Sequence, residues 1–280
     1  MLFYLNYFYR KLFTNIFEIV QPRWAAYLLH MAYIASKFFK QLQWQNLADF
    51  NEIVTTEAHY FIRPKTFDAI CASPDYERPD VDLTKQLLAA ELAQGETVLY
   101  LDIGANIGCY SIRVANAFRN TEGLSILAYE PYQESYDLLQ RNIHVNDLSG
   151  KICARNTALG ETPGTSPLCI NDIDAGSNSL SPRGPTSGKI FHVSVSRLDD
   201  DEIAWKARKN ATAVFLKLDC EGMEVPALRG GKRFLAEIPN ATLMVEDCVD
   251  SRVQQFLANQ HWELFAKLTP YNSFWRRVAQ

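Results

Sequence analysis

A short loop of small and polar residues, built around Asp102, Gly104, Asn106 and Gly108, links an apolar run to a helix-forming segment. Glycines at such a turn let the backbone bend sharply and approach a ligand closely. A nicotinamide dinucleotide fold would offer GxGxxG here, which fits a pyrophosphate onto the helix N-terminus. This chain has GxNxG around Ala105, preceded by an acid, which is awkward beside a pyrophosphate. The loop therefore predicts a cationic ligand, such as the ammonium group of a methionine moiety.

A second acid ends the next apolar run. Glu130 is followed by Pro131, which stops that strand from continuing. A carboxylate in this place can accept hydrogen bonds from both hydroxyls of an adenosine ribose, since dinucleotide folds place an acid similarly. The structural alternative is a carboxylate that only neighbours a helix N-terminus. Asn156, Thr157 and Ala158 follow the third strand and could place polar groups beside an adenine.

A third group of charged residues, Lys217, Asp219 and Glu221, lies at the end of a later apolar run. Lys217 and Asp219 share one strand face, because side chains alternate along a strand. Asp219 and Glu221 emerge at the carboxyl edge, where the reactive group of a ligand in this cleft would lie. The alternative is a structural Lys–Asp ion pair, since unpaired charge in so apolar a strand is costly. Glu246 and Asp247 end the next strand at the same edge and can join these acids. Metal binding by the acids stays open as an alternative, but no histidine has metal-ligand spacing, so we assign no metal ligand.

These residues need a sheet to bring them together. Strands separated by helix-length segments require a parallel sheet covered on both faces. The last two apolar segments have no helix between them, which allows an antiparallel edge. The pattern predicts a doubly wound α/β domain with its ligand at the carboxyl ends of the strands. The expected strands of this domain are 98–103, 125–130, 151–159, 168–170, 191–195, 213–219, 241–246, 262–265 and 274–278, with one more candidate at 59–63 before it. The expected helices are 80–93, 109–118, 132–145, 225–235 and 253–259.

Composition narrows the function classes. The 280 residues can form one large domain or a domain with an appendage. The net charge of −4 argues against a partner bound by broad neutralisation of nucleic-acid phosphates. The six cysteines are scattered without a CxxC, so we expect neither a zinc site nor a disulfide framework. These features predict a reduced, cytoplasmic protein.

Residues 1–40 are rich in aromatic and aliphatic side chains with interleaved Lys and Arg. No apolar run approaches the roughly 20 residues that span a bilayer, and a signal peptide fits poorly. One or two amphipathic helices remain, which either pack on the domain or on a second subunit of a homo-oligomer, or make peripheral contact with the inner face of a membrane. We assign residues 1–79 to this helical, aromatic extension and its connector, and residues 80–280 to the main domain.

Several motifs resemble the FkbM family of methyltransferases over about residues 95 to 250. They occur in order as VLYLDIGANIGCYS, AYEP, RNIHVNDL, NTALG, GSNSL, VSVSRLDD and FLKLDCEGMEVPALRGG. The resemblance implies a class I, Rossmann-like methyltransferase fold: a mostly parallel seven-stranded sheet with an antiparallel edge strand. It also implies S-adenosyl-L-methionine as donor and O-methylation of a hydroxyl on sugars of surface polysaccharides or lipopolysaccharides, or on natural products.

The resemblance carries site roles onto this chain. The Ser177-Asn178-Ser179 turn looks like part of the acceptor side. Displacement from a sulfonium depends on positioning and benefits from a base, for which we expect Asp219 or Glu221, with His192 as a competitor. The expected cofactor-binding residues are Asp102, Gly104, Ala105, Asn106, Gly108, Glu130, Pro131, Thr157, Ala158 and Asp219, and the expected catalytic residues are Asp219, Glu221 and Lys217.

The predicted function is O-methylation of a hydroxyl on a glycan, polysaccharide, lipid-linked saccharide or small molecule. Two alternatives stay open: an NAD-dependent oxidoreductase on the same fold, and a non-catalytic methyltransferase-like scaffold. The spacing of the glycine loop argues against the first. Retention of the loop acid, its glycines and Glu130 argues against the second, because function resides in the site.

Overall fold

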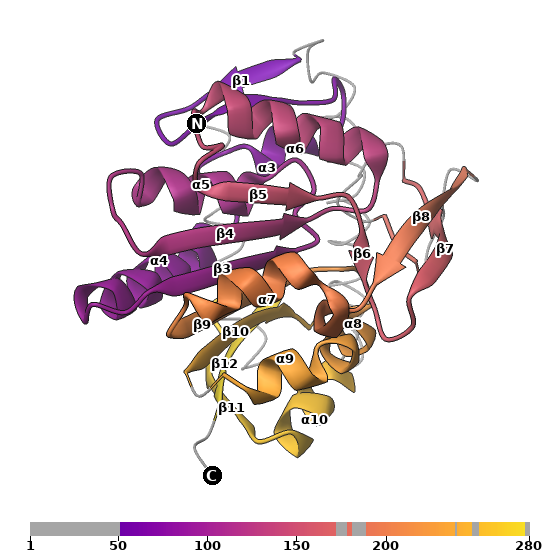
Figure 1. The fold of residues 1–280 in the computed structure, drawn as a ribbon. Helices are drawn as coiled ribbons and strands as arrows, with labels where there is room; N and C mark the ends of the chain where they lie inside the picture. The colour runs from indigo at the N-terminus through magenta and orange to yellow at the C-terminus, as the bar shows by residue number, and fades with distance from the viewer. Residues whose placement is uncertain (1–50, 172–177, 181–188, 239, 248–251, 278–280) are drawn as a thin grey trace, which may run out of the picture. The chain divides into compact units, whose positions relative to one another are not determined.

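A seven-stranded sheet forms the centre of the protein, seen in a computed structural model that describes residues 51–171, 178–180, 189–238, 240–247 and 252–277 (Figure 1). The strands lie in the order β11-β12-β10-β9-β3-β4-β5. The pairs β3·β4, β3·β9, β4·β5 and β9·β10 are parallel, whereas β12 is antiparallel to both β10 and β11. The predicted mostly parallel sheet is confirmed, and its reversed strand is second from the edge. The bounds are β3 Val98–Ile103, β4 Leu124–Tyr129, β5 Ile152–Arg155, β9 Ala213–Leu218, β10 Ala241–Glu246, β11 Trp262–Ala266 and β12 Asn272–Arg277.

Helices cover both faces of this sheet, because both faces are apolar. On β3, Tyr100 faces one core cluster, whereas Leu99 and Leu101 face the other. The first cluster packs against α4 (Arg78–Ala93), α5 (Cys109–Ala117) and α6 (Gln133–Val145). The second packs against α7 (Glu202–Lys209), α8 (Glu224–Gly230), α9 (Lys232–Ala236) and α10 (Arg252–Asn259). The single helix predicted over 225–235 is therefore two helices, which meet at Gly231.

A smaller sheet stands beyond the carboxyl ends of the central strands (Figure 1). It consists of β6 (Ala158–Leu159), β8 (Ile190–Ser196) and β7 (Gly164–Cys169), in that order. The single strand predicted over 151–159 is thus divided, since β5 belongs to the central sheet and β6 to the small one. On β8, Val193 and Val195 are buried and His192 is exposed, as alternation along a strand requires.

The compact unit that contains the sheet begins at Asp49, earlier than the boundary at residue 80 expected from the sequence. Its first elements are β1 (Glu52–Val54), β2 (His59–Phe61) and α3 (Asp68–Cys71). Asn142 on α6 fixes β2: its side chain accepts from the N–H of Phe61 at 2.6 Å and donates to the carbonyl of Phe61 at 3.1 Å. A buried asparagine thereby supplies the hydrogen bonds that a neighbouring strand would give.

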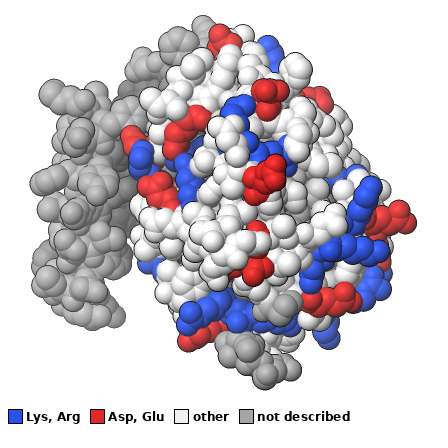
Figure 2. Space-filling view, turned by 60° about the vertical axis from the view of Figure 1, so that its left-hand side comes forward, with Lys and Arg blue, Asp and Glu red and all other residues white. Residues whose placement is uncertain are grey.

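The other sequence predictions concern residues 1–40, membrane-spanning helices, the cysteines and the surface charge. The helices predicted over residues 1–40 lie outside the described residues. No helix in the described ranges has the length and apolar composition needed to cross a bilayer. The five cysteines within those ranges are all free, as expected. Figure 2 shows basic and acidic side chains interspersed on the face that it draws, without one broad basic area among the described residues.

Candidate active site

A cleft with about 570 Å³ of space, part of it open to solvent, lies at the carboxyl edge of the central sheet. The loops after β3, β4 and β9 form one side of the cleft, and the small sheet closes the other. The lining residues are Ile103, Gly104, Asn106, Tyr129, Glu130, Pro131, Thr157, Ala158, Leu159, Leu168, Asn178, Leu180, Asp219, Cys220, Glu221 and Met223.

The glycine loop is fastened to the end of β4. The N–H groups of Gly104 and Ala105 both donate to the carbonyl of Tyr129, at 3.0 and 2.9 Å. Gly104 and Gly108 have φ values of 84° and 92°, and Asn106 has a φ of 49°. This is the left-handed region that glycine adopts freely and asparagine tolerates. Gly104 and Asn106 line the cleft, whereas Gly108 is the N-cap of α5.

Glu130 lies buried at one end of the cleft, directly after β4. Its carboxylate accepts from the N–H of Asn106 and from the N–H of Tyr132, each at 2.8 Å. Burial raises the pKa of Glu130 to about 7, although these hydrogen bonds and the charge of Arg63 act in the opposite direction. The predicted neighbours Pro131, Thr157 and Ala158 all line the same cleft. The structure thus gathers most of the predicted cofactor residues.

Ala105, Gly108 and Asp102 are absent from the lining of the cleft. Asp102 has its partners elsewhere. It is fully buried: Oδ2 accepts from the N–H of Ser111 at 3.1 Å and from its hydroxyl at 2.6 Å, and Oδ1 lies 3.2 Å from Nζ of Lys217. Alternation along β3 turns this side chain toward α5 and away from the cleft. Asp102 therefore anchors α5 and Lys217, in place of the expected contact with an ammonium group.

Lys217 joins this buried acid to the acid at the strand end. Its Nζ lies 3.2 Å from Asp102 and 3.2 Å from Asp219, and the side chain is 3% exposed. Burial alone would lower the pKa of Lys217, but the two carboxylates raise it well above its usual value. The structural ion pair weighed from the sequence is present, and Lys217 acts by holding Asp219 at the cleft.

Three carboxylates lie close together, and two of them, Asp219 and Glu221, line the other end of the cleft. One oxygen each from Asp219, Glu221 and Glu246 lies within 4.8 Å of the others, a spacing that could hold a metal ion. The turn that carries Asp219 and Glu221 is fixed by Glu224. Its Oε1 accepts from the N–H groups of Cys220 and Gly222 at 3.0 and 3.2 Å. Together the acids give this end a negative potential, which matches a positively charged ligand.

The expected acceptor-side residues divide into two groups. Ser179 donates its hydroxyl to the carbonyl of Glu221 at 2.6 Å, and Asn178 lines the cleft. Ser177 lies outside the described residues. His192 is exposed on β8 and is absent from the lining of the cleft. Asp247 is buried with Lys267 at 2.7 Å, so Glu246 alone of that pair joins the acids.

Glu77 is a further acid near this end that sequence reasoning missed. It precedes α4 with a φ of 45°, and its Oε2 accepts from Oη of Tyr110 at 2.6 Å and from Nδ2 of Asn272 at 3.0 Å. No hydrogen bond from a described residue reaches Oε1 of Glu77. Burial and the charge of Asp219 raise the pKa of Glu77, against the effects of Tyr110 and Lys217. An acid at the start of a helix is so common that it does not mark a functional residue in the sequence.

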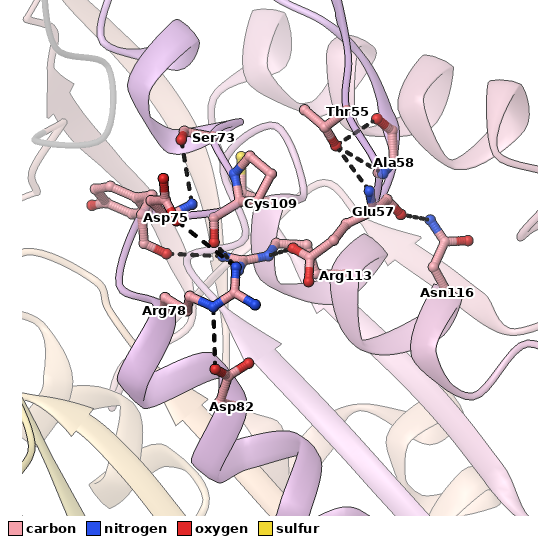
Figure 3. Close-up of polar contacts among 12 residues, drawn as sticks. Thr55, Glu57, Ala58, Ser73, Asp75, Arg78, Asp82, Cys109, Arg113 and Asn116 are labelled. Carbon is pink, nitrogen blue, oxygen red and sulfur yellow. Dashed lines mark hydrogen bonds and ion pairs between the residues drawn. The ribbon is translucent and has the colours of Figure 1, made fainter. Parts of the chain in front are cut away.

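Buried Arg113 fixes the loop that carries Glu77 (Figure 3). Its guanidinium donates to the carbonyls of Pro74 and Tyr76, at 2.7 and 2.9 Å, and pairs with Glu57 at 2.7 Å. Three contacts on one rigid planar group hold the backbone just before the left-handed Glu77. Such strain persists only where surrounding contacts determine the conformation.

Comparison with known proteins gives a consistent result. The family described as the methyltransferase FkbM domain matches residues 102–271. Methyltransferase sdnD of Sordaria araneosa is 34% identical over 97 residues, which cover 35% of this chain and 36% of that protein. Methyltransferase 1 of Beauveria bassiana is 28% identical over 149 residues, which cover 46% of this chain and 57% of that protein. The chain thus spans about a third and just over half of the lengths of these two relatives.

Solved structures of methyltransferases are also among the chains similar to this one. The crystal structure of methyltransferase FkbM from Methylobacillus flagellatus KT is similar with a TM-score of 0.41 and 20% identity. The match covers 65% of this chain and 43% of that one.

Proposed function

This chain belongs to the FkbM methyltransferase family, and from that premise we propose that it is an S-adenosylmethionine-dependent O-methyltransferase. The observation that carries the proposal is a single cleft with two unlike ends. At one end, after β4, lies the buried carboxylate of Glu130, and at the other, after β9, lie Asp219 and Glu221, with Glu246 close to both of these acids. A donor with a ribose at one end and a sulfonium and an ammonium at the other is complementary to both.

The residues present fit this donor. A carboxylate that accepts two backbone N–H groups still has lone pairs for two ribose hydroxyls, so Glu130 can orient a nucleoside. Thr157 and Ala158 line the cleft where the base would lie, and the Gly104–Asn106 backbone lies beside the sugar and the amino acid. When bound, the donor supplies an electrophilic methyl group. The acids near Asp219 favour its positive charge.

The chain's own residues then hold the acceptor and move one proton. A hydroxyl has a pKa far above 7, so a carboxylate that takes its proton as the bond forms accelerates the reaction. Asp219 and Glu221 both line the cleft and remain the proposed bases. Lys217 fixes the orientation of Asp219, and Glu224 fixes the turn around Glu221. Positioning of the hydroxyl supplies the remaining acceleration.

The proposed acceptor is a sugar hydroxyl in a glycan, a polysaccharide or a lipid-linked saccharide. Its support is the family resemblance, together with the charge of the site. Acids at the acceptor end disfavour phosphorylated or carboxylated acceptors through like-charge repulsion, and favour neutral sugars. We also propose that the chain acts in the cytoplasm, as its free cysteines suggest.

Donor binding is the first test. Calorimetric titration of the full chain with S-adenosylhomocysteine should show one site, and the same titration with NAD should show none. Glu130→Gln should weaken the first titration, because it removes the charged acceptor for the ribose. Binding of NAD with similar affinity would favour the oxidoreductase alternative.

The acceptor is identified by following the methyl group. Cell extract is incubated with methyl-labelled donor and the full chain, and then separated into polysaccharide, lipid and small-molecule fractions. We expect label in a saccharide-containing fraction, removable by glycosidase digestion and absent with Glu130→Gln. Label confined to protein or nucleic acid would overturn the saccharide proposal. Donor binding without label in any fraction would favour the scaffold alternative.

A further inference from the structure

Arg63 lies just after β2, in a segment that the sequence analysis assigned to a connector. It is 9% exposed, and its guanidinium donates hydrogen bonds to the side chains of neighbouring residues. Nε and Nη2 pair with the two oxygens of Asp68, each at 2.8 Å, and Nη1 donates to Oγ of Ser135 at 3.0 Å. The backbone N–H of Arg63 also donates to Asp68 at 3.0 Å. A buried arginine with so many partners has one fixed geometry.

The remaining contact of Arg63 points at the cleft. Nη2 donates to Oδ1 of Asn106 at 3.0 Å, and the N–H of Asn106 donates to Oε2 of Glu130 at 2.8 Å. Asn106 and Glu130 both line the cleft. Asn106 has a left-handed backbone, which costs about 1 kcal/mol or more in a non-glycine residue unless its surroundings hold it. The Arg63 contact is the side-chain bond that holds it.

The charge of Arg63 also acts on Glu130. The groups that face Glu130 are Arg63 from the segment after β2, Asp102 from β3, and the N–H groups of Asn106 and Tyr132. Among these, Arg63 is the cation, and it favours the charged carboxylate. The carboxylate is the form that accepts hydrogen bonds from two ribose hydroxyls.

We propose that Arg63 is a positioning residue of the donor site: it fixes Asn106 in its left-handed conformation and so holds the N–H group of Asn106 on the carboxylate of Glu130. Residues 59–68 are then part of the donor site, although they lie before the segment that matches the family. The inference rests on the proposed function only in that S-adenosylhomocysteine serves as the probe.

The test compares Arg63→Gln and Arg63→Lys with the wild type, by titration with S-adenosylhomocysteine across a pH series. Loss of a group that orients a ligand-binding residue typically weakens binding by about tenfold or more, which we expect for Arg63→Gln. The midpoint of the pH dependence should also rise, because the cation that favours the charged form of Glu130 is gone. Arg63→Lys keeps the charge and loses the planar fork, so affinity should fall with little movement of the midpoint.

The matched control is Arg208→Gln. Arg208 is a half-buried arginine that donates to the carbonyls of Ala211 and Glu237, far from the lining of the cleft. Arg208→Gln should lower the melting temperature and leave the S-adenosylhomocysteine affinity and the midpoint of its pH dependence unchanged. If Arg63→Gln folds and binds S-adenosylhomocysteine with the affinity and the pH midpoint of the wild type, the inference is overturned. If Arg63→Gln does not fold, wild-type affinity in Arg63→Lys overturns it instead. A wild type that fails to bind the probe would count against the proposed function.

Discussion

The α-carbon of Gly104 faces the backbone carbonyl of Asp219 so closely that a methyl group added to it would lie 1.8 Å from that oxygen. The glycine thereby lets the loop after β3 rest directly on the loop after β9. One loop lies on the donor side of the cleft and the other carries a proposed base. Their separation is set by the absence of one side chain.

Gly104→Ala should therefore disrupt both loops. The substitution adds a backbone clash to the strain of a φ of 84°, so we expect S-adenosylhomocysteine binding to be lost and the melting temperature to fall. Gly95→Ala is a matched control, because Gly95 has a φ of 80° with no atom within 4 Å of an added Cβ. It should show only the strain of a left-handed alanine, about 1 kcal/mol. Equal effects of the two variants in thermal unfolding would contradict the close contact.

The raised pKa of Glu130 predicts pH-dependent donor binding. With a pKa of about 7, Glu130 is largely protonated in mildly acidic solution and accepts poorly from ribose hydroxyls. S-adenosylhomocysteine affinity should fall as the pH is lowered through 7, approaching tenfold per unit below it. Glu130→Gln should bind more weakly and show a flat profile in the same calorimetric series. A wild-type profile that stays flat would contradict the buried carboxylate.

The raised pKa of Glu130 also makes the stability of the unliganded protein depend on pH. Stability should fall as the pH rises, whereas donor affinity should rise. The pKa of Glu130 is higher in the folded state than in the unfolded chain. Its stabilising contribution is therefore present below about pH 4.5 and is lost as the pH rises through 7, by at most about 3 kcal/mol. Relative to Glu130→Gln, the wild type should lose melting temperature over that range.

Much of this site was predictable because its signals are local. An apolar run with an acid or a glycine at its end indicates a buried parallel strand, which placed Glu130 and Asp219 at one edge. Arg63 and Glu77 were not predictable, since their contacts with Asn106 and Tyr110 join positions 43 and 33 residues apart. No periodicity marks such pairs. The direction of the Asp102 side chain could have been predicted from the sequence. Successive side chains of a strand point to opposite faces, so Asp102 points away from the face of its neighbour Ile103, which lines the cleft.

Lys217 neutralises two acids in an apolar strand, so its removal should be costly. Lys217→Met leaves the fully buried Asp102 without its cation, and we expect a loss of about 3–5 kcal/mol in denaturant unfolding. The double variant Lys217→Met, Asp102→Asn should recover part of that loss, because the stranded charge is gone. Lys85→Met is the control: its pair with Glu57 is partly exposed and should contribute about 1 kcal/mol or less. If Lys217→Met and Lys85→Met lose the same free energy of unfolding, the burial of the Lys217–Asp102 pair does not make it more important than a partly exposed pair.

The charge of Asp219 acts on Glu77, and this repulsion should appear in the stability of the protein. The amide of Glu77→Gln keeps an oxygen for Tyr110 and Asn272, so packing is retained. Because the folded pKa of Glu77 is raised, its contribution is present at low pH and lost as the pH rises. Glu77→Gln should therefore raise the melting temperature more at about pH 8 than at about pH 5. The neighbouring exposed Asp75→Asn should show no such difference, and a lower melting temperature at both pH values would argue that Glu77 is purely structural.

Asp219 and Glu221 are tested by separating binding from chemistry. Both line the cleft, and only a base would act on the rate while leaving donor affinity nearly unchanged. We expect Asp219→Asn or Glu221→Gln to lower kcat by about 10²–10⁴ with S-adenosylhomocysteine affinity within a few-fold of wild type. Label transfer to the acceptor fraction gives the rate, and calorimetry gives the affinity. Asp219→Asn also loses its charged contact with Lys217, so Glu221→Gln is the cleaner variant. Near-normal rates in both would remove the carboxylate base and leave positioning of the hydroxyl as the source of acceleration.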